Sequence, residues 1–223
     1  MEKNKVFNIG LWKTGTKTFG QAIRMLGYRV HDEFWPIEVG LDGDPVSAEK
    51  AIKIHKVIVE HDAFSDSPWL NIYKQLYAWY PDAKFVLTVR ASGEARAASE
   101  YFHARREGDV VEDIPTSQVF VDQYEKHNEE VKAFFKDKPN QLLEMCFEQG
   151  DGWNKLCRFL NVFPPNVPFP HENKTNHHAL IVELDKRVFH IERLLNTHPD
   201  VLLDALMHLR KQYKEPKKSN ETE

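Results

Sequence analysis

The sequence predicts an α/β fold in three layers, with a mostly parallel central sheet between flanking helices. Short apolar runs rich in β-branched residues recur along the chain, and longer segments with helical periodicity separate them. Parallel strands need long crossover connections, which helices usually supply. The chain has 223 residues, of which 41% are hydrophobic and 29% charged, and its composition shows no break. We therefore expect one sizeable core and a single domain.

The apolar runs predict strands at residues 5–11, 56–60, 84–90 and 141–147. The segments between and after them predict helices at residues 16–26, 68–79, 93–106, 117–136, 152–160, 179–195 and 199–213. Residues 161–178 are rich in proline, which removes backbone donors, so we expect a loop there. The single domain should cover residues 1–213, and the polar residues 214–223 should form a disordered tail.

One predicted helix, at residues 117–136, carries a stripe of large apolar side chains. The members recur at a spacing close to the helical period and fall near one face: Phe120, Tyr124, Val131, Phe134 and Phe135. Such a stripe is typical of a helix that packs against a core.

Charge and cysteine content exclude several kinds of partner. The net charge is −4 at pH 7, so no global positive field attracts nucleic acid or an anionic membrane surface, and any anion must be bound locally. No window approaches the roughly 18 apolar residues of a membrane span, and residues 1–10 contain no apolar stretch of signal-peptide length. Cys146 and Cys157 lie in apolar segments, which favours buried free thiols in a reducing compartment. These features predict a cytoplasmic protein.

The stretch "LWKTGTKTF", residues 11–19, follows the apolar run "VFNIG" and predicts an anion site. A strand, a tight loop and a helix that begins near Thr16 would point successive backbone N–H groups at one small volume. The positive end of the helix dipole and the side chain of Lys13 would converge there. The natural occupant is a phosphate or a sulfate.

The ATP-binding loop G-x-x-x-x-G-K-[ST] is a rival interpretation of this stretch. Gly10 and Gly15 have its spacing, but Thr16 stands where that loop has lysine, and Lys17 comes one residue late. An offset of one residue turns a side chain by about 100° on a helix. Lys13 instead approaches a ligand from within the loop.

The segment "WKTGTKT" resembles the phosphosulfate-binding loop of the sulfotransferases that use 3′-phosphoadenosine 5′-phosphosulfate (PAPS), whose usual form is P-K-[ST]-G-T-T-x. Trp12 replaces the proline, and Lys17 replaces the second threonine. The segments "YPDAK", "GDGWNKLCRFLNV" and "PFPHEN" extend the resemblance over roughly residues 5–173. It implies that the following residues surround the 5′-phosphosulfate: Lys13, Thr14, Gly15, Thr16, Lys17 and Thr18.

A second anion site is expected at Arg90, at the carboxyl end of the predicted strand 84–90. Ligands of open α/β sheets bind beyond that edge, and an arginine there suits bidentate phosphate contact. In the sulfotransferases that the chain resembles, a serine about eight residues after the arginine helps to bind the 3′-phosphate. Ser99 follows Arg90 by nine positions and opens "SEYFH", which resembles the family's sequence after that serine. Ser92 is the alternative.

The acceptor must lose a proton, and two residues are candidates for the base. If residues 56–60 form a strand, His61, Asp62 and Asp66 should lie near the same carboxyl edge as the loop. The resemblance favours His61 by position in many members of the family. It favours Asp66 in one subgroup, which has an Asp-x-Pro segment and then "YPDAK" as this chain does. Val59 replaces a lysine that accompanies the histidine. Asp66 could also cap a helix that starts near Pro68. The sequence leaves His61 and Asp66 both open.

The resemblance implies a sulfotransferase that moves a sulfuryl group from PAPS to a hydroxyl or amine of a small-molecule acceptor and releases adenosine 3′,5′-bisphosphate. Lys13 would neutralise charge that develops on the bridging oxygen, so no metal is expected. Aromatic residues near the expected site could line an acceptor pocket: Trp12, Phe34, Trp35, Phe64, Trp69, Tyr101 and Phe102. The alternatives are a P-loop kinase for small molecules or nucleotides and a non-catalytic nucleotide-binding descendant.

Overall fold

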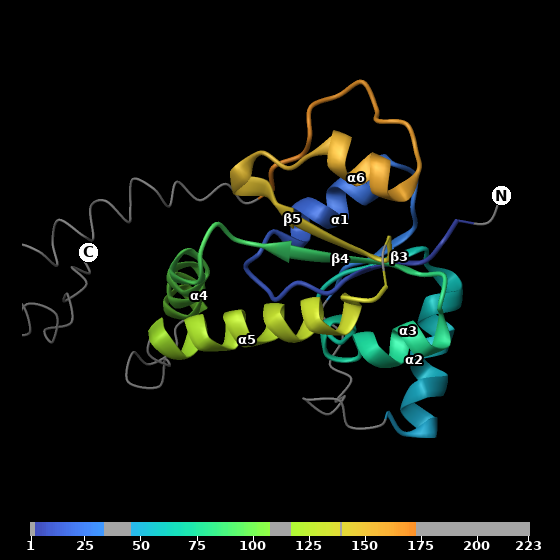
Figure 1. The fold of residues 1–223 in the computed structure, drawn as a ribbon, viewed down its shortest axis with the longest axis horizontal. Helices are drawn as coiled ribbons and strands as arrows, with labels where there is room; N and C mark the ends of the chain where they lie inside the picture. Colours follow the sequence, from blue (N-terminus) through green and yellow to red (C-terminus); the bar gives the residue numbers. More distant parts are fainter. Residues whose placement is uncertain (1–2, 34–45, 108–116, 139, 173–223) are drawn as a thin grey trace, which may run out of the picture. The chain divides into compact units, whose positions relative to one another are not determined.

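The computed structural model describes residues 3–33, 46–107, 117–138 and 140–172 (Figure 1). These residues belong to the first of two units, Met1–Lys174 and Thr175–Glu223, into which the chain divides. The predicted helices 179–195 and 199–213 and the predicted tail 214–223 lie outside the described residues. The single domain over residues 1–213 therefore stays a prediction.

A parallel sheet of five strands forms the middle layer. Its strands are β1 (Val6–Asn8), β2 (Val30–His31), β3 (Ala63–Phe64), β4 (Lys84–Val89) and β5 (Leu142–Cys146). They lie in the order β2-β3-β1-β4-β5, and every neighbouring pair is parallel. The predicted parallel sheet is confirmed, and its strand order brings the segments after β1, β3, β4 and β5 to one edge.

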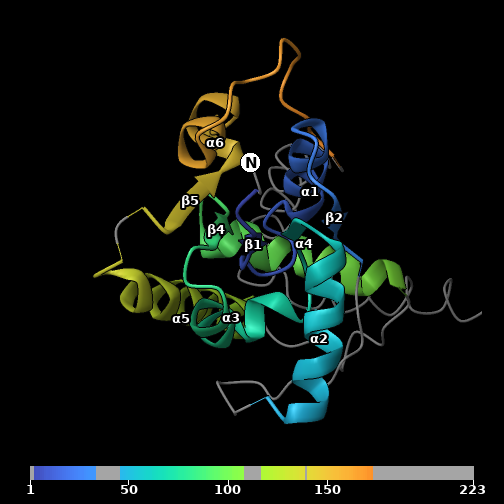
Figure 2. The ribbon, with the colours of Figure 1, turned by 90° about the vertical axis from the view of Figure 1, so that its right-hand side faces the viewer.

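Helices cover both faces of the sheet, as Figures 1 and 2 show. One face is covered by α1 (Thr16–Met25) and α6 (Trp153–Leu160). The other carries α2 (Ala48–Glu60), α3 (Tyr73–Trp79) and α5 (Ser117–Phe135), with α4 (Gly93–Glu107) against α5. Two short 3-10 helices, η1 (Trp69–Asn71) and η3 (Phe147–Gln149), follow β3 and β5. The three-layer α/β architecture is confirmed.

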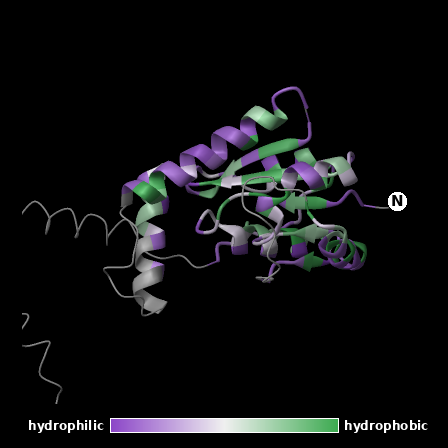
Figure 3. Ribbon diagram, turned by 90° about the horizontal axis from the view of Figure 1, so that it is seen from below, coloured by the Kyte–Doolittle hydropathy of each residue, from purple (hydrophilic) through white to green (hydrophobic). Residues whose placement is uncertain are grey.

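Successive strand residues point to opposite faces of the sheet, so each face has its own core. In Figure 3 the strands are mainly hydrophobic, whereas the helices mix hydrophilic and hydrophobic residues. On the α1 and α6 side the buried cluster contains Val6, Phe19, Ile23, Val86, Met145 and Leu156. On the opposite side it contains Phe7, Ile58, Leu76, Phe85, Val131 and Phe135. The aromatic stripe predicted for residues 117–136 therefore packs on the core, with Phe120 and Tyr124 also buried.

The predicted strand at residues 56–60 is wrong, because this segment is the last part of α2. Ile54 and Ile58 are completely buried, whereas Val59 is 72% exposed. Burial at a spacing of four residues matches one face of a helix, and a strand would bury alternate residues. The strand of this region is β3, which starts only at Ala63.

The boundaries of the other predicted strands and helices that fall on described residues agree with the structure to within a few residues, except for the predicted helix 68–79. That segment divides into η1 and α3, which are joined at Ile72. The predicted loop contains no helix or strand over its described part, residues 161–172. Cys146 and Cys157 are buried and free, as expected. Within the described ranges, no helix combines the length and apolar character needed to cross a membrane.

Candidate functional site

The candidate site lies at the carboxyl edge of the sheet, where open parallel sheets bind ligands. The segment 10–15 follows β1 and leads into α1. Asp66 follows β3, Arg90 follows β4, and Glu148 follows β5. Because the order is β3-β1-β4-β5, the loop after β1 lies between Asp66 on one side and Arg90 on the other.

The loop between β1 and α1 depends on two glycines. A Cβ on Gly10 would lie 2.2 Å from Oγ1 of Thr88, so no side chain fits there. Gly15 has a φ of +98°, and its Cβ would lie 2.6 Å from the ring of Phe147. Lys13 also adopts a positive φ, 66°. α1 begins at Thr16, as the sequence predicts, so the loop delivers the free N–H groups of its first turn to the site.

A buried polar network fixes the start of this loop. The side chain of Asn8 donates from Nδ2 to Ser65 Oγ at 3.1 Å. Its Oδ1 accepts the backbone N–H of Gly10 and the hydroxyl of Thr88, each at 3.1 Å. Asn8 and Thr88 were not among the predicted site residues. The signal that could have found them is a polar side chain inside each of two apolar strand segments.

His127 lies in α5, on the face of the sheet opposite α1, and contacts the backbone where the loop begins. Its Nε2 donates to the backbone carbonyl of Ile9 at 2.7 Å. Burial lowers the pKa of His127, which keeps the imidazole neutral at pH 7 with its proton on the donating nitrogen. This residue was not singled out from the sequence either.

The hydroxyl side chains of the loop bind other parts of the protein. Thr14 Oγ1 lies 2.7 Å from Thr88 Oγ1 and donates to the carbonyl of Leu11. Thr18 Oγ1 accepts the backbone N–H of Glu172 at 3.1 Å. Thr16 is buried. These threonines therefore shape the loop through their side chains and offer a ligand mainly their backbone N–H groups.

The two lysines of the loop region differ in their surroundings. Lys17 Nζ donates to the carbonyl of Asp32 at 2.6 Å and lies 3.6 Å from the carboxylate of Asp66. Its ammonium group is thus directed toward the ends of β2 and β3. Lys13 is half-buried and lies within the loop itself.

Arg90 joins the second predicted anion site to the first. Its Nη1 donates to the carbonyl oxygen of Lys13 at 3.3 Å, and its Nη2 forms an ion pair with Glu148. The backbone N–H of Arg90 donates to Tyr124 Oη at 2.9 Å, and that hydroxyl donates back to the Arg90 carbonyl at 3.1 Å. Nε of Arg90 is buried and has no hydrogen-bond partner among the described residues.

The two candidate serines have different surroundings. Ser92 caps α4, since its Oγ accepts the backbone N–H of Ala95 at 3.2 Å. Ser99 is half-buried in the body of α4, two turns further along the helix. The hydroxyl of Ser92 is thus used as a helix cap, whereas Ser99 has no capping role.

Asp66 lies beside the loop and does not cap a helix. The residue that precedes η1 is Pro68, and no side chain caps that helix. The carboxylate of Asp66 instead faces Lys17, and its backbone φ is 68°. Burial raises the pKa of this carboxyl above its usual value, and the attraction of Lys17 and a hydrogen bond with Thr16 oppose that rise.

His61 and Asp62 precede β3, so their expected position at the carboxyl edge is wrong. His61 ends α2, and its carbonyl accepts a hydrogen bond from Lys5 Nζ at 2.6 Å, just before β1 begins. Asp62 binds Arg29 with both carboxylate oxygens. The misplaced strand 56–60 caused this error. The structure brings Asp66 next to the loop and leaves His61 near the amino end of β3.

The predicted aromatic pocket is wrong at two of its residues. Phe64 and Trp69 are completely buried in the core, so they do not line an open cleft. Trp12 is 40% exposed and donates from Nε1 to Glu100 at 3.0 Å. Phe34 and Trp35 lie outside the described residues, as do the side chains of Tyr101 and Phe102.

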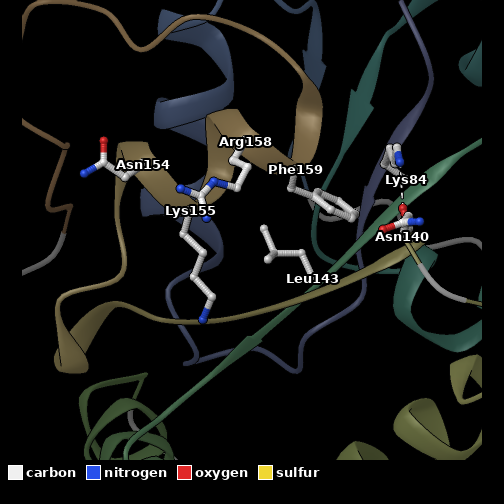
Figure 4. A pocket seen from close by; sticks show the side chains of 7 residues that line it. All are labelled: Lys84, Asn140, Leu143, Asn154, Lys155, Arg158 and Phe159. Atoms are coloured by element: carbon white, nitrogen blue, oxygen red, sulfur yellow. Dashed lines mark hydrogen bonds between the residues drawn. The ribbon is translucent and has the colours of Figure 1, made fainter.

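A hollow of about 620 Å³ lies elsewhere, between α6 and the amino end of β4 (Figure 4). It is lined by Lys84, Asn140, Leu143, Asn154, Lys155, Arg158 and Phe159. None of these residues belongs to the predicted site. Across the described part of the chain, no three His, Cys, Asp or Glu side chains are grouped so that they could hold a metal ion.

Comparison with known proteins identifies a family. A family model described as a sulfotransferase domain matches residues 5–100 and 95–178, which include every candidate residue named above. No curated protein matches the chain.

Proposed function

The chain belongs to the sulfotransferase domain family, and we propose that it transfers a sulfuryl group from PAPS to a hydroxyl or amine of a small-molecule acceptor, releasing adenosine 3′,5′-bisphosphate. One observation favours PAPS as the sulfuryl donor. The guanidinium of Arg90 contacts the backbone of Lys13, so the two predicted anion sites would lie at one edge of the sheet. A nucleotide with phosphate groups on both its 5′ and 3′ positions has a negative charge for each of these two sites.

The loop and Arg90 fit the two ends of such a nucleotide. The backbone N–H groups at the start of α1 and the ammonium group of Lys13 suit the 5′-phosphosulfate. Nε of Arg90 is buried and has no hydrogen-bond partner within the described part of the chain, so it is a donor that a phosphate oxygen would satisfy. Ser99 of α4 is the proposed further ligand of the 3′-phosphate.

Lys13 is proposed to supply charge stabilisation in the reaction. The acceptor oxygen or nitrogen forms a bond to sulfur while the bond between sulfur and the bridging oxygen of the nucleotide breaks. Negative charge then develops on that bridging oxygen, and a nearby ammonium group stabilises it. A lysine fixed within the loop suits this task because the loop positions it before the reaction starts.

Asp66 is the base that the geometry favours over His61. It lies at the carboxyl edge beside Lys17, whereas His61 lies at the amino end of β3. Its raised pKa makes the carboxylate a better proton acceptor than an exposed aspartate. We propose that Asp66 accepts the proton of the acceptor hydroxyl. We also propose a cytoplasmic location, in keeping with the free thiols of Cys146 and Cys157.

Two measurements test the proposal. Adenosine 3′,5′-bisphosphate should raise the Tm of the protein with concentration, because a ligand that binds only the folded state stabilises it. ATP with magnesium should have the smaller effect, and the opposite order would favour a kinase. Labelled sulfate from PAPS should then appear on a component of a metabolite extract; nucleotide binding without any transfer would indicate a non-catalytic descendant.

A further inference from the structure

Arg90 is already engaged by an acidic side chain of this protein. Glu148 lies in η3, directly after β5. One of its carboxylate oxygens, Oε1, forms an ion pair with Arg90 Nη2. The other, Oε2, accepts the backbone N–H of Ala91 at 2.8 Å. The carboxylate thus bridges the guanidinium of Arg90 and the backbone N–H of the next residue, Ala91, in the loop after β4.

This pair of donors is the kind that binds a phosphate group. A guanidinium N–H and a neighbouring backbone N–H at the end of a parallel strand suit any oxyanion with two oxygens in one plane. A carboxylate and a phosphate present the same acceptor geometry to them. The carboxylate of Glu148 and a bound phosphate therefore cannot both accept from Nη2 of Arg90 and the N–H of Ala91 at the same time.

The surroundings indicate which of the two charged groups can move. The side chain of Arg90 is 14% exposed, and its other contacts hold it against Lys13. The side chain of Glu148 is 38% exposed. Its described polar contacts are those with Arg90 and Ala91. An incoming anion would displace the more exposed carboxylate, and the guanidinium would stay in place.

Resting on the proposed function, we propose that Glu148 is an internal competitor for the nucleotide's 3′-phosphate: its carboxylate occupies Arg90 and the Ala91 amide in the free protein and leaves both when the nucleotide binds. Glu148 then lowers the affinity for nucleotides that carry a 3′-phosphate. It has little effect on nucleotides that lack one. The residue therefore sets how strongly the protein discriminates between these two classes of ligand.

The test compares two nucleotides on two variants by isothermal titration calorimetry. E148Q keeps the size of the side chain but removes its charge. It should bind adenosine 3′,5′-bisphosphate at least about fivefold more tightly than the wild-type protein, because release of a charged group from Arg90 costs more than release of a neutral amide. Its affinity for adenosine 5′-phosphate should change less than about twofold. E144Q is the matched control, because Glu144 on β5 pairs with Lys132 and loses the same charge.

Each other outcome has a distinct meaning. Weaker binding of the bisphosphate by E148Q would show that Glu148 orients Arg90 for the ligand, and would overturn the proposal. Equal tightening for both nucleotides, or the same gain in E144Q, would indicate a general charge effect and would also overturn it. If E148Q is folded, as checked by its Tm, and binds the bisphosphate as the wild-type protein does, Glu148 is not a competitor. The proposed function would not be affected by that result. Failure of the wild-type protein to bind the bisphosphate at all would instead overturn the proposed function.

Discussion

Arg90 donates from Nη1 to the backbone carbonyl of Lys13 at 3.3 Å, although 77 positions separate the two residues in the chain. The contact exists because β1 and β4 are neighbours in the sheet, in register from Val6 and Lys84 onward. Arg90 directly follows β4, and Lys13 lies in the loop that follows β1. This single relationship joins the loop before α1 to the arginine at the end of β4.

Arg90→Ala should remove the preference for a 3′-phosphate. A hydrogen bond to a charged group contributes about 1.5–3 kcal/mol, which corresponds to a loss of roughly 10- to 150-fold in affinity for adenosine 3′,5′-bisphosphate. Affinity for adenosine 5′-phosphate should change little. Calorimetric titration of both nucleotides checks this. An equal loss for the two ligands would mean that Arg90 only supports the fold of the loop.

Lys13→Ala should reduce the rate of sulfuryl transfer more than it reduces nucleotide binding. Removal of a group that stabilises developing charge typically lowers kcat by about 10²- to 10³-fold. The rate of label transfer from PAPS to the extract measures this effect. Lys126→Ala is the control, since that lysine is exposed on α5 and pairs with Glu130. Full activity of Lys13→Ala would exclude the role proposed for Lys13.

Asp66→Asn should abolish most activity and yet stabilise the protein at pH 7. The folded-state pKa of Asp66 is raised by burial, so the stability that its protonated form contributes is present below the unfolded pKa of about 3.9 and is lost as the pH rises through the folded value. Asparagine avoids this loss, and a missing general base lowers the rate by roughly 10²- to 10⁴-fold. Tm measurements at pH 7 and near pH 3 should show a gain at pH 7 only.

Asp62→Asn should destabilise the protein at pH 7, the opposite of the effect expected for Asp66→Asn. Arg29 holds the pKa of Asp62 well below its usual range, so this carboxylate contributes stability above its unfolded pKa and loses it as the pH falls through the folded value. The pair is partly exposed, so we expect a loss of about 1 kcal/mol at pH 7, or roughly 2–4 °C in Tm. Sulfuryl transfer should be retained. A Tm change of the same sign in both variants would contradict the assigned environments.

Asn8→Ala should destabilise the protein and weaken the anion site together. The substitution leaves Ser65 Oγ, the Gly10 N–H and the Thr88 hydroxyl without their buried partner. Leaving buried polar groups unpaired costs about 1–3 kcal/mol, with roughly 2–4 °C in Tm for each kcal/mol. Thermal unfolding with and without the bisphosphate measures both effects. Asn4→Ala, at an exposed position before β1, should change neither.

Ile58→Ala and Val59→Ala test the helix that replaces the predicted strand. Ile58 is completely buried, so its truncation should cost about 2–5 kcal/mol. Val59 is exposed on the other side of α2, and its truncation should stay within about 0.5 kcal/mol. Denaturant unfolding of the two variants gives both values. Similar large losses at both positions would mean that this segment is buried on both faces, as in a central strand.

The strongest sequence signals were local ones, and the structure agrees with them. The strand, loop and helix around residues 6–25 follow from an apolar run, a glycine with positive φ and a helix start within twenty residues. The aromatic stripe of α5 follows from its period alone, and the position of Arg90 follows from the end of a strongly apolar strand. In each case the residues that decide the structure are close together in the chain.

The segment at residues 56–60 shows where such reasoning fails. A run of β-branched residues fits a buried strand and the end of a helix equally well over so short a length. Its state was decided by Ile54 and Ile58, which pack on a sheet whose strands come from other parts of the chain. Because of this error, His61 was predicted to lie at the carboxyl edge of the sheet and was as strong a candidate for the base as Asp66.

Local patterns in the sequence were enough to predict the fold class, the family and the loop that carries Lys13, because period, glycine position and strand ends are local properties. Three contacts could be known only from the folded chain: Arg90 with Lys13, Asp66 rather than His61 beside the loop, and Glu148 with Arg90. These contacts depend on the strand order β2-β3-β1-β4-β5, which is not the order of the chain. Neighbours at the edge of such a sheet are set by the packing of distant strands, and no short stretch of sequence contains that information.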